Sequence, residues 1–153
     1  YFDSKDFNIS FLVILLISLL ILWQNKKETF WTNFALLTSV LAVGCAIVYF
    51  MKNYFERQRP PAVFNEGNIN ILYEKIHKNS FPSGHTEIAV TVSTFMLIQV
   101  KKYWYLYIFF AVFSGFYRIY AGSHFPSDVF AGAFIGIISA YIIIELFKKH
   151  TKI

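Results

Sequence analysis

Five apolar stretches, separated by short polar breaks, make up most of the chain. They cover residues 9–23, 30–51, 82–100, 103–120 and 129–147. A helix needs about 20 apolar residues to cross the hydrocarbon core of a bilayer, and the first stretch, with about 15, is shorter than that. The pattern predicts an all-α fold: a polytopic transmembrane helical bundle with about five spans, formed by a single integral membrane domain over residues 1–153.

The composition also indicates a membrane protein. Apolar residues are 56% of the chain and charged residues only 15%, which is more apolar than ordinary soluble domains. The net charge of +5 does not indicate nucleic-acid binding, because the basic residues lie in short clusters between the apolar stretches. These clusters are Lys26 and Lys27, Lys101 and Lys102, and Lys148, Lys149 and Lys152. With them on the cytoplasmic side, five spans place segment 52–80 and loop 121–128 together on the outer side.

Two features concern the limits of the chain and its single cysteine. The chain begins at Tyr1 and not at a methionine, which leaves open a missing N-terminal span or a shorter architecture. Cys45 is the only cysteine, so an intrachain disulfide is excluded. Its position in the middle of an apolar stretch favours the interpretation of Cys45 as a small core residue.

Lys52 and Arg59 are the first candidate phosphate ligands. They are seven residues apart, and on a helix this spacing of two turns places them on one face. A guanidinium offers a planar fork for phosphate oxygens, and an ammonium adds a mobile point charge. The alternative is a pair of long side chains that extend from the end of a span to the interface. Pro60, directly after Arg59, makes the spacing more specific for a phosphate site.

The sequence Pro82-Ser83-Gly84-His85 is typical of a helix start, with Ser80 or Ser83 as the capping residue. Free N–H groups and the positive end of the helix dipole form an anion site there. Gly84 lets a bound group approach the backbone, and the Ser83 hydroxyl can donate to it. His85 is placed to give a proton to a leaving oxygen. The alternative is an ordinary capped helix with an incidental histidine.

Arg118, His124 and Asp128 form a third group, with the spacing Arg-x5-His-x3-Asp. A carboxylate beside a histidine fixes its tautomer and supports positive charge on the ring. With its Nδ1 proton held by Asp128, His124 would present Nε2 as a nucleophile. Arg118 would neutralise phosphoryl oxygens. The alternatives are an N-cap role for Asp128 and an interfacial position for Arg118.

In this order the three groups resemble the motifs of the type 2 phosphatidic acid phosphatases, which are Lys-x6-Arg-Pro, Pro-Ser-Gly-His and Ser-Arg-x5-His-x3-Asp. The resemblance covers residues 52–128. One departure is Tyr117 in place of the serine that precedes the arginine. The other is five visible spans, where the family usually has six.

The resemblance implies a metal-independent lipid phosphatase with a phosphohistidine intermediate. His124 would attack phosphorus, His85 would protonate the leaving lipid alcohol, and Asp128 would orient His124. The phosphate-binding set implied is Lys52, Arg59, Ser83, the Gly84 amide and Arg118. No cofactor is expected, since the cationic side chains take the role of a metal ion.

The resemblance also implies partners and a location. The expected partners are a phosphorylated lipid substrate and the membrane lipids, with no nucleic acid and no obligate protein partner. The expected location is the bacterial cytoplasmic (inner) membrane, with the site facing the periplasm or exterior. The role of Glu87 stays open between contact with a substrate amine and a favourable interaction with the helix dipole.

Two other functions are considered. A non-catalytic membrane protein with a phosphate pocket would need the cations but not His85, His124 and Asp128. A phosphotransferase with a lipid acceptor would share every motif with a hydrolase. The candidate substrates are phosphatidic acid, phosphatidylglycerol phosphate, undecaprenyl diphosphate and lipid A 1-phosphate. The compact chain most resembles small bacterial envelope enzymes, with the lipid A 1-phosphatase group first.

Overall fold

The structure, a computed structural model, describes residues 5–64 and 77–151. Its long helices are α1 (Lys5–Asn25), α2 (Phe30–Phe55), α4 (Gly84–Gln99), α5 (Trp104–Tyr120) and α6 (Pro126–Thr151). Helix α3 is a short turn at Pro60–Val63, and the 3-10 turns η1 (Lys27–Thr29) and η2 (Lys101–Tyr103) join α1 to α2 and α4 to α5. Within the described ranges there are helices and connecting segments but no strand, so the predicted all-α bundle with five long helices is confirmed.

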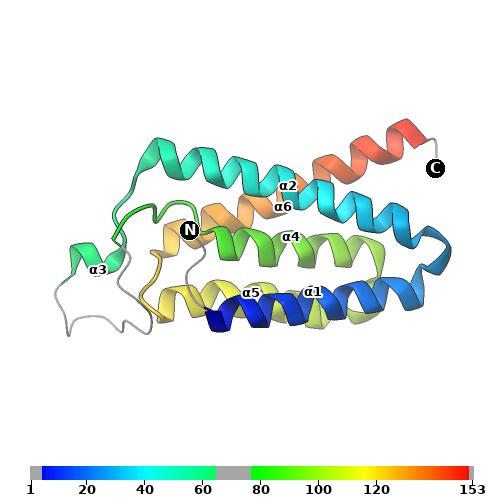
Figure 1. Cartoon of the computed structure of the whole chain (residues 1–153), viewed down its shortest axis with the longest axis horizontal. Helices are drawn as coiled ribbons and strands as arrows, with labels where there is room; N and C mark the ends of the chain where they lie inside the picture. The colour runs from blue at the N-terminus through cyan, green and yellow to red at the C-terminus, as the bar shows by residue number, and fades with distance from the viewer. Residues whose placement is uncertain (1–4, 65–76, 152–153) are drawn as a thin grey trace.

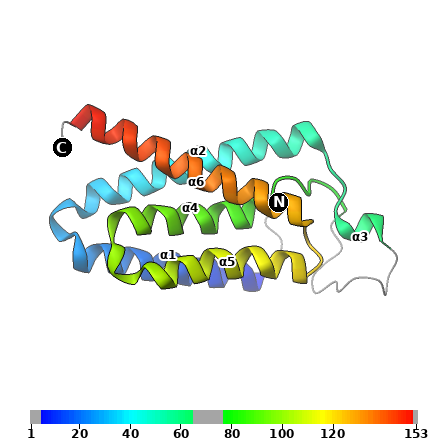
Figure 2. The ribbon, with the colours of Figure 1, turned by 180° about the vertical axis from the view of Figure 1, so that it is seen from behind.

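Helix α4 is the central element of the bundle. It contacts α1, α2, α5 and α6, and Figures 1 and 2 show it between the α1–α5 side and the α2–α6 side. Phe95 and Met96 of α4 are fully buried and pack in one apolar cluster with Val40 of α2 and Ile144 of α6. Because every other long helix packs on α4, the residues at its N-terminus lie close to the ends of several helices.

The outward faces of the helices are strongly apolar. The most exposed side chains of α5 and α6 include Phe109, Val112, Phe116, Phe130 and Phe134. Such a surface is unfavourable in water and is covered by hydrocarbon in a bilayer. The stretches Lys27–Val63 and Pro126–His150 are long and apolar enough to cross a membrane. The exposed apolar faces and these two stretches are typical of a membrane protein.

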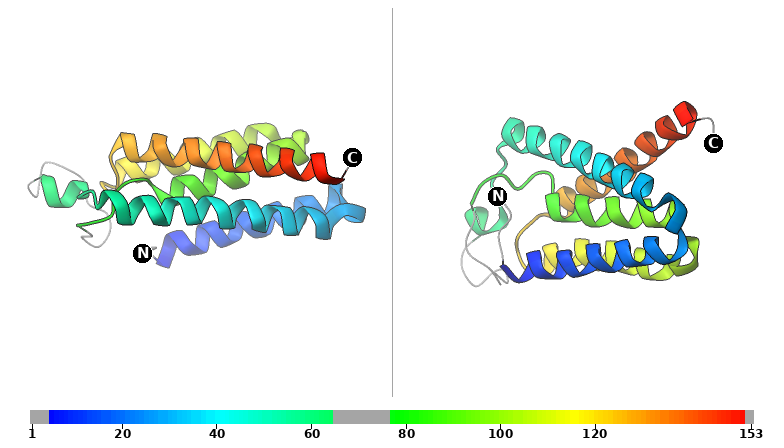
Figure 3. Two further views of the ribbon diagram at one scale, coloured as in Figure 1. Left: turned by 90° about the horizontal axis from the view of Figure 1, so that it is seen from above. Right: turned by 45° about the vertical axis from the view of Figure 1, so that its right-hand side comes forward.

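The motif-bearing segments and the lysine clusters lie at opposite ends of the bundle. In Figure 1 the left end holds α3, the last turns of α2 and α5 and the first turns of α4 and α6, while the α1–α2 and α4–α5 connections lie at the right. Figure 3 shows the same separation, with α6 crossing α2 toward the C-terminal end. The lysines at 26–27, 101–102 and 148–149 are therefore at the end opposite the motifs, as predicted; Lys152 lies outside the described residues.

Gly132 and Gly136 bring α6 close to α4. A Cβ atom at Gly136 would lie 2.7 Å from the carbonyl oxygen of Glu87, and one at Gly132 would collide with the carbonyl oxygen of Ser83. Both obstacles are backbone atoms, which cannot rotate away. The absence of side chains at these two glycines is what lets the helices approach so closely.

Gly132→Ala will lower the unfolding temperature of the protein in detergent. Overpacking costs up to about 3 kcal/mol, which exceeds the gain of about 1 kcal/mol that alanine offers over glycine in a helix. The control is Ile137→Ala on the outward side of α6, where the side chain is 49% exposed. An unfolding temperature for Gly132→Ala at or above that of the wild type would contradict the close α4–α6 contact.

Candidate active site

A cavity of about 250 Å³ opens at the end of the bundle that carries the motifs. Five of the eight predicted site residues line it: Lys52, Arg59, Gly84, His85 and His124. They come from α2, the segment before α3, the start of α4 and the α5–α6 loop. Electrostatic interactions also link His85 to Arg118, as well as to His124. Cations and both imidazoles from separate segments of the chain therefore meet at one site.

The remaining wall of this cavity is mainly apolar. Val48, Tyr49 and Ile88 contribute to it, together with Cys45. Val48 and Cys45 lie about one and two helical turns before Lys52 along α2. The cavity thus combines a cationic rim with an apolar wall that continues toward the middle of the bundle, which suits a ligand with an anionic head and an apolar tail.

Lys52 and Arg59 reach the cavity from different kinds of backbone. Helix α2 ends before Glu56, which has a left-handed φ of 42°, and Arg59 is extended with φ −88° and ψ 161°. The shared helical face predicted from their spacing is therefore wrong, because the helix stops between them. Lys52 Nζ donates to the carbonyl oxygen of Asn79 at 2.6 Å, and Arg59 Nε donates to that of Lys78 at 3.1 Å. The segment before α4 thus holds both cations.

The first turn of α4 faces the same cavity. Ser83 is the N-cap residue, and its carbonyl oxygen accepts the N–H of Glu87 at 3.0 Å. Its hydroxyl is 3.0 Å from that of Thr86 and does not cap the helix, so the predicted side-chain cap is wrong. The reason is that the buried Ser83 hydroxyl has a partner within its own turn. Gly84 and His85 follow directly and line the cavity.

Arg118 and His124 are fixed by the end of α5 and the loop after it. Arg118 lies in the last turn of α5 and is 2% exposed. Its carbonyl oxygen accepts the N–H groups of Ser123 at 3.1 Å and His124 at 3.3 Å. Gly122, at φ 67°, adopts the left-handed conformation that glycine tolerates best, and so reverses the chain. These bonds return His124 to the interior, where it is buried.

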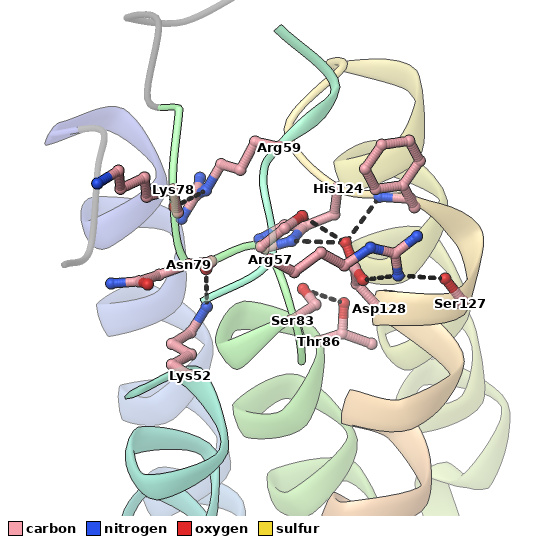
Figure 4. A network of polar contacts seen from close by, with 12 residues as sticks. Lys52, Arg57, Arg59, Lys78, Asn79, Ser83, Thr86, His124, Ser127 and Asp128 are labelled. Atoms are coloured by element: carbon pink, nitrogen blue, oxygen red, sulfur yellow. Dashed lines mark hydrogen bonds and ion pairs between the residues drawn. The ribbon is translucent and has the colours of Figure 1, made fainter. Parts of the chain in front are cut away.

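Asp128 lies in the first turn of α6 and is completely buried (Figure 4). Its Oδ2 accepts the N–H of Phe125 at 2.9 Å, as in a capping box, and the hydroxyl of Ser80 at 2.5 Å. Its Oδ1 accepts a hydrogen bond from Nη1 of Arg57 at 2.7 Å. His124 Nδ1 is 3.6 Å from Oδ2, adjacent but farther than a hydrogen bond reaches. Asp128 therefore stabilises the start of α6 from the third helical position, and not as the N-cap residue that the sequence suggested. It lies beside His124, but the hydrogen bond to Nδ1 expected from the sequence is not formed.

The environment of His124 sets its protonation state. Burial lowers the pKa of the His124 imidazole from 6.5 to about 4; the neighbouring Asp128 opposes this shift, and the positive charges of Arg59 and Lys52 add to it. His124 is therefore neutral near pH 7. A neutral imidazole has the free lone pair that a nucleophile needs.

The contacts of Arg57 and Ser80 with Asp128 were missed by the sequence analysis, which named Ser80 only as a possible helix cap. Arg57 Nη1 also donates to the Ser127 hydroxyl at 2.7 Å, and its guanidinium lies 4.4 Å from the ring centre of Phe125. The only sequence signal for Arg57 is a second arginine two residues before Arg59 in a short polar segment. That signal is weak, because a surface arginine has the same appearance in sequence.

Glu87 is an interior residue of the bundle. Its carboxyl is fully buried, and Oε1 accepts the Thr91 hydroxyl at 2.8 Å. Gly44 of α2 makes room for it, since a Cβ there would collide with the same oxygen. Glu87 also contributes to the cavity wall. In residues 5–64 and 77–151, no group of three or more His, Cys, Asp or Glu is arranged to hold a metal ion.

Acidification from pH 7.5 to 4.5 will destabilise the wild type more than His124→Gln. A histidine whose pKa is lowered in the folded state contributes to the stability of that state at pH values above its unfolded pKa of 6.5. This contribution is lost as the pH falls toward 4. The expected difference is roughly 2 to 3 kcal/mol at pH 4.5. Unfolding temperatures in detergent at both pH values report this difference as a larger decrease for the wild type. Equal decreases in the two proteins would contradict the buried neutral imidazole.

Comparison with known proteins gives consistent relatives. Residues 32–152 match the PAP2 superfamily. The chain is 38% identical over 76 residues to bacitracin transport permease protein BcrC of Bacillus licheniformis, covering 50% of this chain and 37% of that protein. It is 29% identical over 119 residues to undecaprenyl-diphosphatase BcrC of Bacillus subtilis, covering 78% and 58%. It is 31% identical over 109 residues to lipid A 1-phosphatase of Rhizobium etli, covering 69% and 46%.

Two solved structures share the fold. The crystal structure of Aquifex aeolicus LpxE has a TM-score of 0.73 and 31% identity, over 94% of this chain and 88% of that one. A transmembrane PAP2-type phosphatidylglycerolphosphate phosphatase from Bacillus subtilis has a TM-score of 0.66 and 21% identity, over 95% and 71%. The chain spans 37% to 58% of the length of the three curated relatives. With its family match over residues 32–152 and its three motifs around one cavity, the chain belongs to the PAP2 superfamily.

Proposed function

We propose that this protein is a membrane lipid phosphatase, which hydrolyses a phosphomonoester or diphosphate of an envelope lipid through a phosphohistidine intermediate. The observation that carries the proposal is that two imidazoles, His85 and His124, line one cavity with Lys52 and Arg59. A protein that only bound phosphate would need the cations but not a buried, neutral histidine beside a carboxylate. The phosphatase names of the curated relatives support the same reaction.

In the first step, the Nε2 lone pair of His124 attacks phosphorus. The N–P bond forms while the P–O bond to the lipid breaks, and His85 gives its proton to the departing oxygen. The negative charge of the bound phosphate favours the protonated form of His85 at that moment. The equatorial oxygens are stabilised by Lys52, Arg59 and Arg118, with the Ser83 hydroxyl and the Gly84 amide.

In the second step, water attacks the phosphohistidine. His85, now neutral, takes the proton from water, the N–P bond breaks, and inorganic phosphate leaves His124 free. Asp128, beside Nδ1 of His124, favours the positive charge that the ring carries while it is phosphorylated. A lipid hydroxyl in place of water would give phosphotransfer, with the same residues in the same roles.

The proposed location is the bacterial cytoplasmic (inner) membrane, with the cavity on the periplasmic or exterior side. The support is the position of the lysine clusters at the end opposite the cavity, because short loops rich in lysine stay in the cytoplasm. The apolar wall of Val48, Tyr49 and Ile88 would then contact the lipid tail below its phosphate.

Two substrate classes have specific support. Lipid A with a 1-phosphate is supported by the relative from Rhizobium etli. Undecaprenyl diphosphate is supported by the relative from Bacillus subtilis, which shares a longer aligned region with this chain. Phosphatidylglycerol phosphate and phosphatidic acid remain the alternatives, because the fold is also shared with a phosphatidylglycerolphosphate phosphatase.

His124→Ala will reduce phosphate release by about 10³-fold or more, because removal of a nucleophile eliminates the covalent route. The matched control is His150→Ala, which removes an exposed histidine at the far end of α6. Phosphate release in detergent measures both, with the unfolding temperature as a check on folding. Near-normal turnover by His124→Ala would exclude His124 as the nucleophile.

In a panel of the four candidate lipids, the preferred substrate will be lipid A 1-phosphate or undecaprenyl diphosphate, by at least about tenfold in kcat/KM. A clear preference for phosphatidic acid would reject both favoured substrates.

Phosphate release in the same assay should be insensitive to EDTA and inhibited by orthovanadate, which imitates the trigonal-bipyramidal phosphorus. Strict dependence on added magnesium would contradict charge neutralisation by side chains.

A further inference from the structure

Arg57, Ser80 and Asp128 form a closed set of contacts that joins the three motif-bearing segments. Arg57 Nη1 donates to Asp128 Oδ1 at 2.7 Å, and the Ser80 hydroxyl donates to Asp128 Oδ2 at 2.5 Å. The backbone N–H of Ser80 donates to the carbonyl oxygen of Arg57 at 2.9 Å, which closes the set. Arg57 follows α2, Ser80 precedes α4 and Asp128 lies in the first turn of α6, so this set, the Arg57–Ser80–Asp128 clasp, fixes three segments together. Figure 4 labels two of its members, Arg57 and Asp128.

The clasp determines how the Asp128 carboxylate is oriented. Oδ1 is held by Arg57, while Oδ2 is held by Ser80 and by the N–H of Phe125 at 2.9 Å. With donors on both oxygens, the carboxylate plane cannot rotate, and Oδ2 stays 3.6 Å from His124 Nδ1. A small movement of the imidazole then completes a hydrogen bond. Rotation of the carboxylate about its Cβ–Cγ bond would remove that acceptor from His124.

Arg57 contributes charge from a position outside the cavity. It is absent from the cavity wall, and its side chain is 39% exposed, whereas that of Asp128 is 0% exposed. Its guanidinium is further fixed by the Ser127 hydroxyl at 2.7 Å and by the ring of Phe125. Arg57 therefore balances a buried carboxylate and is reached from the aqueous side, without touching the space that a phosphate would occupy.

We propose that Arg57 is a positioning residue for the nucleophile: through the clasp it holds Asp128 in the orientation that supports His124. This inference rests on the proposed phosphohistidine reaction. Arg57 acts on the step in which the imidazole becomes positively charged, because the oriented carboxylate stabilises that charge. Its loss therefore lowers kcat and the rate of phosphoenzyme formation, while substrate binding by Lys52 and Arg59 is retained.

The test compares Arg57→Ala with wild type in the full chain, using the lipid that the panel selects. We expect kcat to fall about 10- to 100-fold, as for a displaced catalytic group, with KM changed less than about threefold. Millimolar guanidinium chloride should restore a large part of the lost rate, since the ion enters the site from water, and equal sodium chloride should not. Gln58→Ala, an exposed neighbour, is the matched control.

Rapid-quench detection of the phosphohistidine separates this inference from the proposed reaction. If wild type forms no phosphoenzyme on His124, the proposed intermediate fails. If wild type forms it and Arg57→Ala forms it at the same rate, or if guanidinium gives no more recovery than sodium chloride, the positioning role of Arg57 is overturned. If Arg57→Ala does not fold, Arg57→Gln, which keeps an N–H donor but loses the charge, is measured against the same outcomes.

Discussion

A buried carboxylate needs hydrogen-bond donors, and the way Asp128 obtains them organises this end of the bundle. Desolvating an ionised group is costly unless donors and charges compensate for it. Asp128 finds its compensation in Arg57, Ser80 and the N–H of Phe125, which belong to three separate segments. Separation of these segments would leave the carboxylate unpaired. The electrostatic requirement of one side chain therefore keeps the motif-bearing segments in register with each other.

The irregular backbone at this end follows from the same requirement for polar partners. Within a helix the carbonyl oxygens are already bonded to N–H groups four residues on, so they are poor partners for cations. The segment before α4 is not helical, and in it the carbonyl oxygen of Asn79 accepts a hydrogen bond from Lys52 and that of Lys78 accepts one from Arg59. In a membrane protein such backbone is tolerated only where protein or water surrounds it. The end of the bundle meets that condition.

Close packing between α4 and α6 transmits this order into the interior. Gly132 lies against the Ser83 carbonyl and Gly136 against that of Glu87, so the start of α6 cannot move away from the start of α4 without losing both contacts. The N–H of Ser83 also donates to the carbonyl oxygen of Asp128 at 2.9 Å. The first turn of α4 and the start of α6 are thus coupled by packing as well as by charge. A methyl group added at Gly132 would therefore also displace the residues at the ends of these two helices.

The sequence alone determined the helical bundle and five of the residues that line the cavity. Apolar stretches of membrane length are visible in one dimension, and the three spaced motifs identified Lys52, Arg59, Gly84, His85 and His124, which all line one cavity. The partners of Asp128 were not predictable, because Arg57 and Ser80 are distant from it in sequence and carry no periodic signal. The end of α2 before Arg59 was not predictable either, because it depends on the left-handed conformation of Glu56. Periodicity and spacing are local properties that a sequence displays, whereas the pairing of a buried charge is decided by which segments the tertiary fold brings within hydrogen-bond reach.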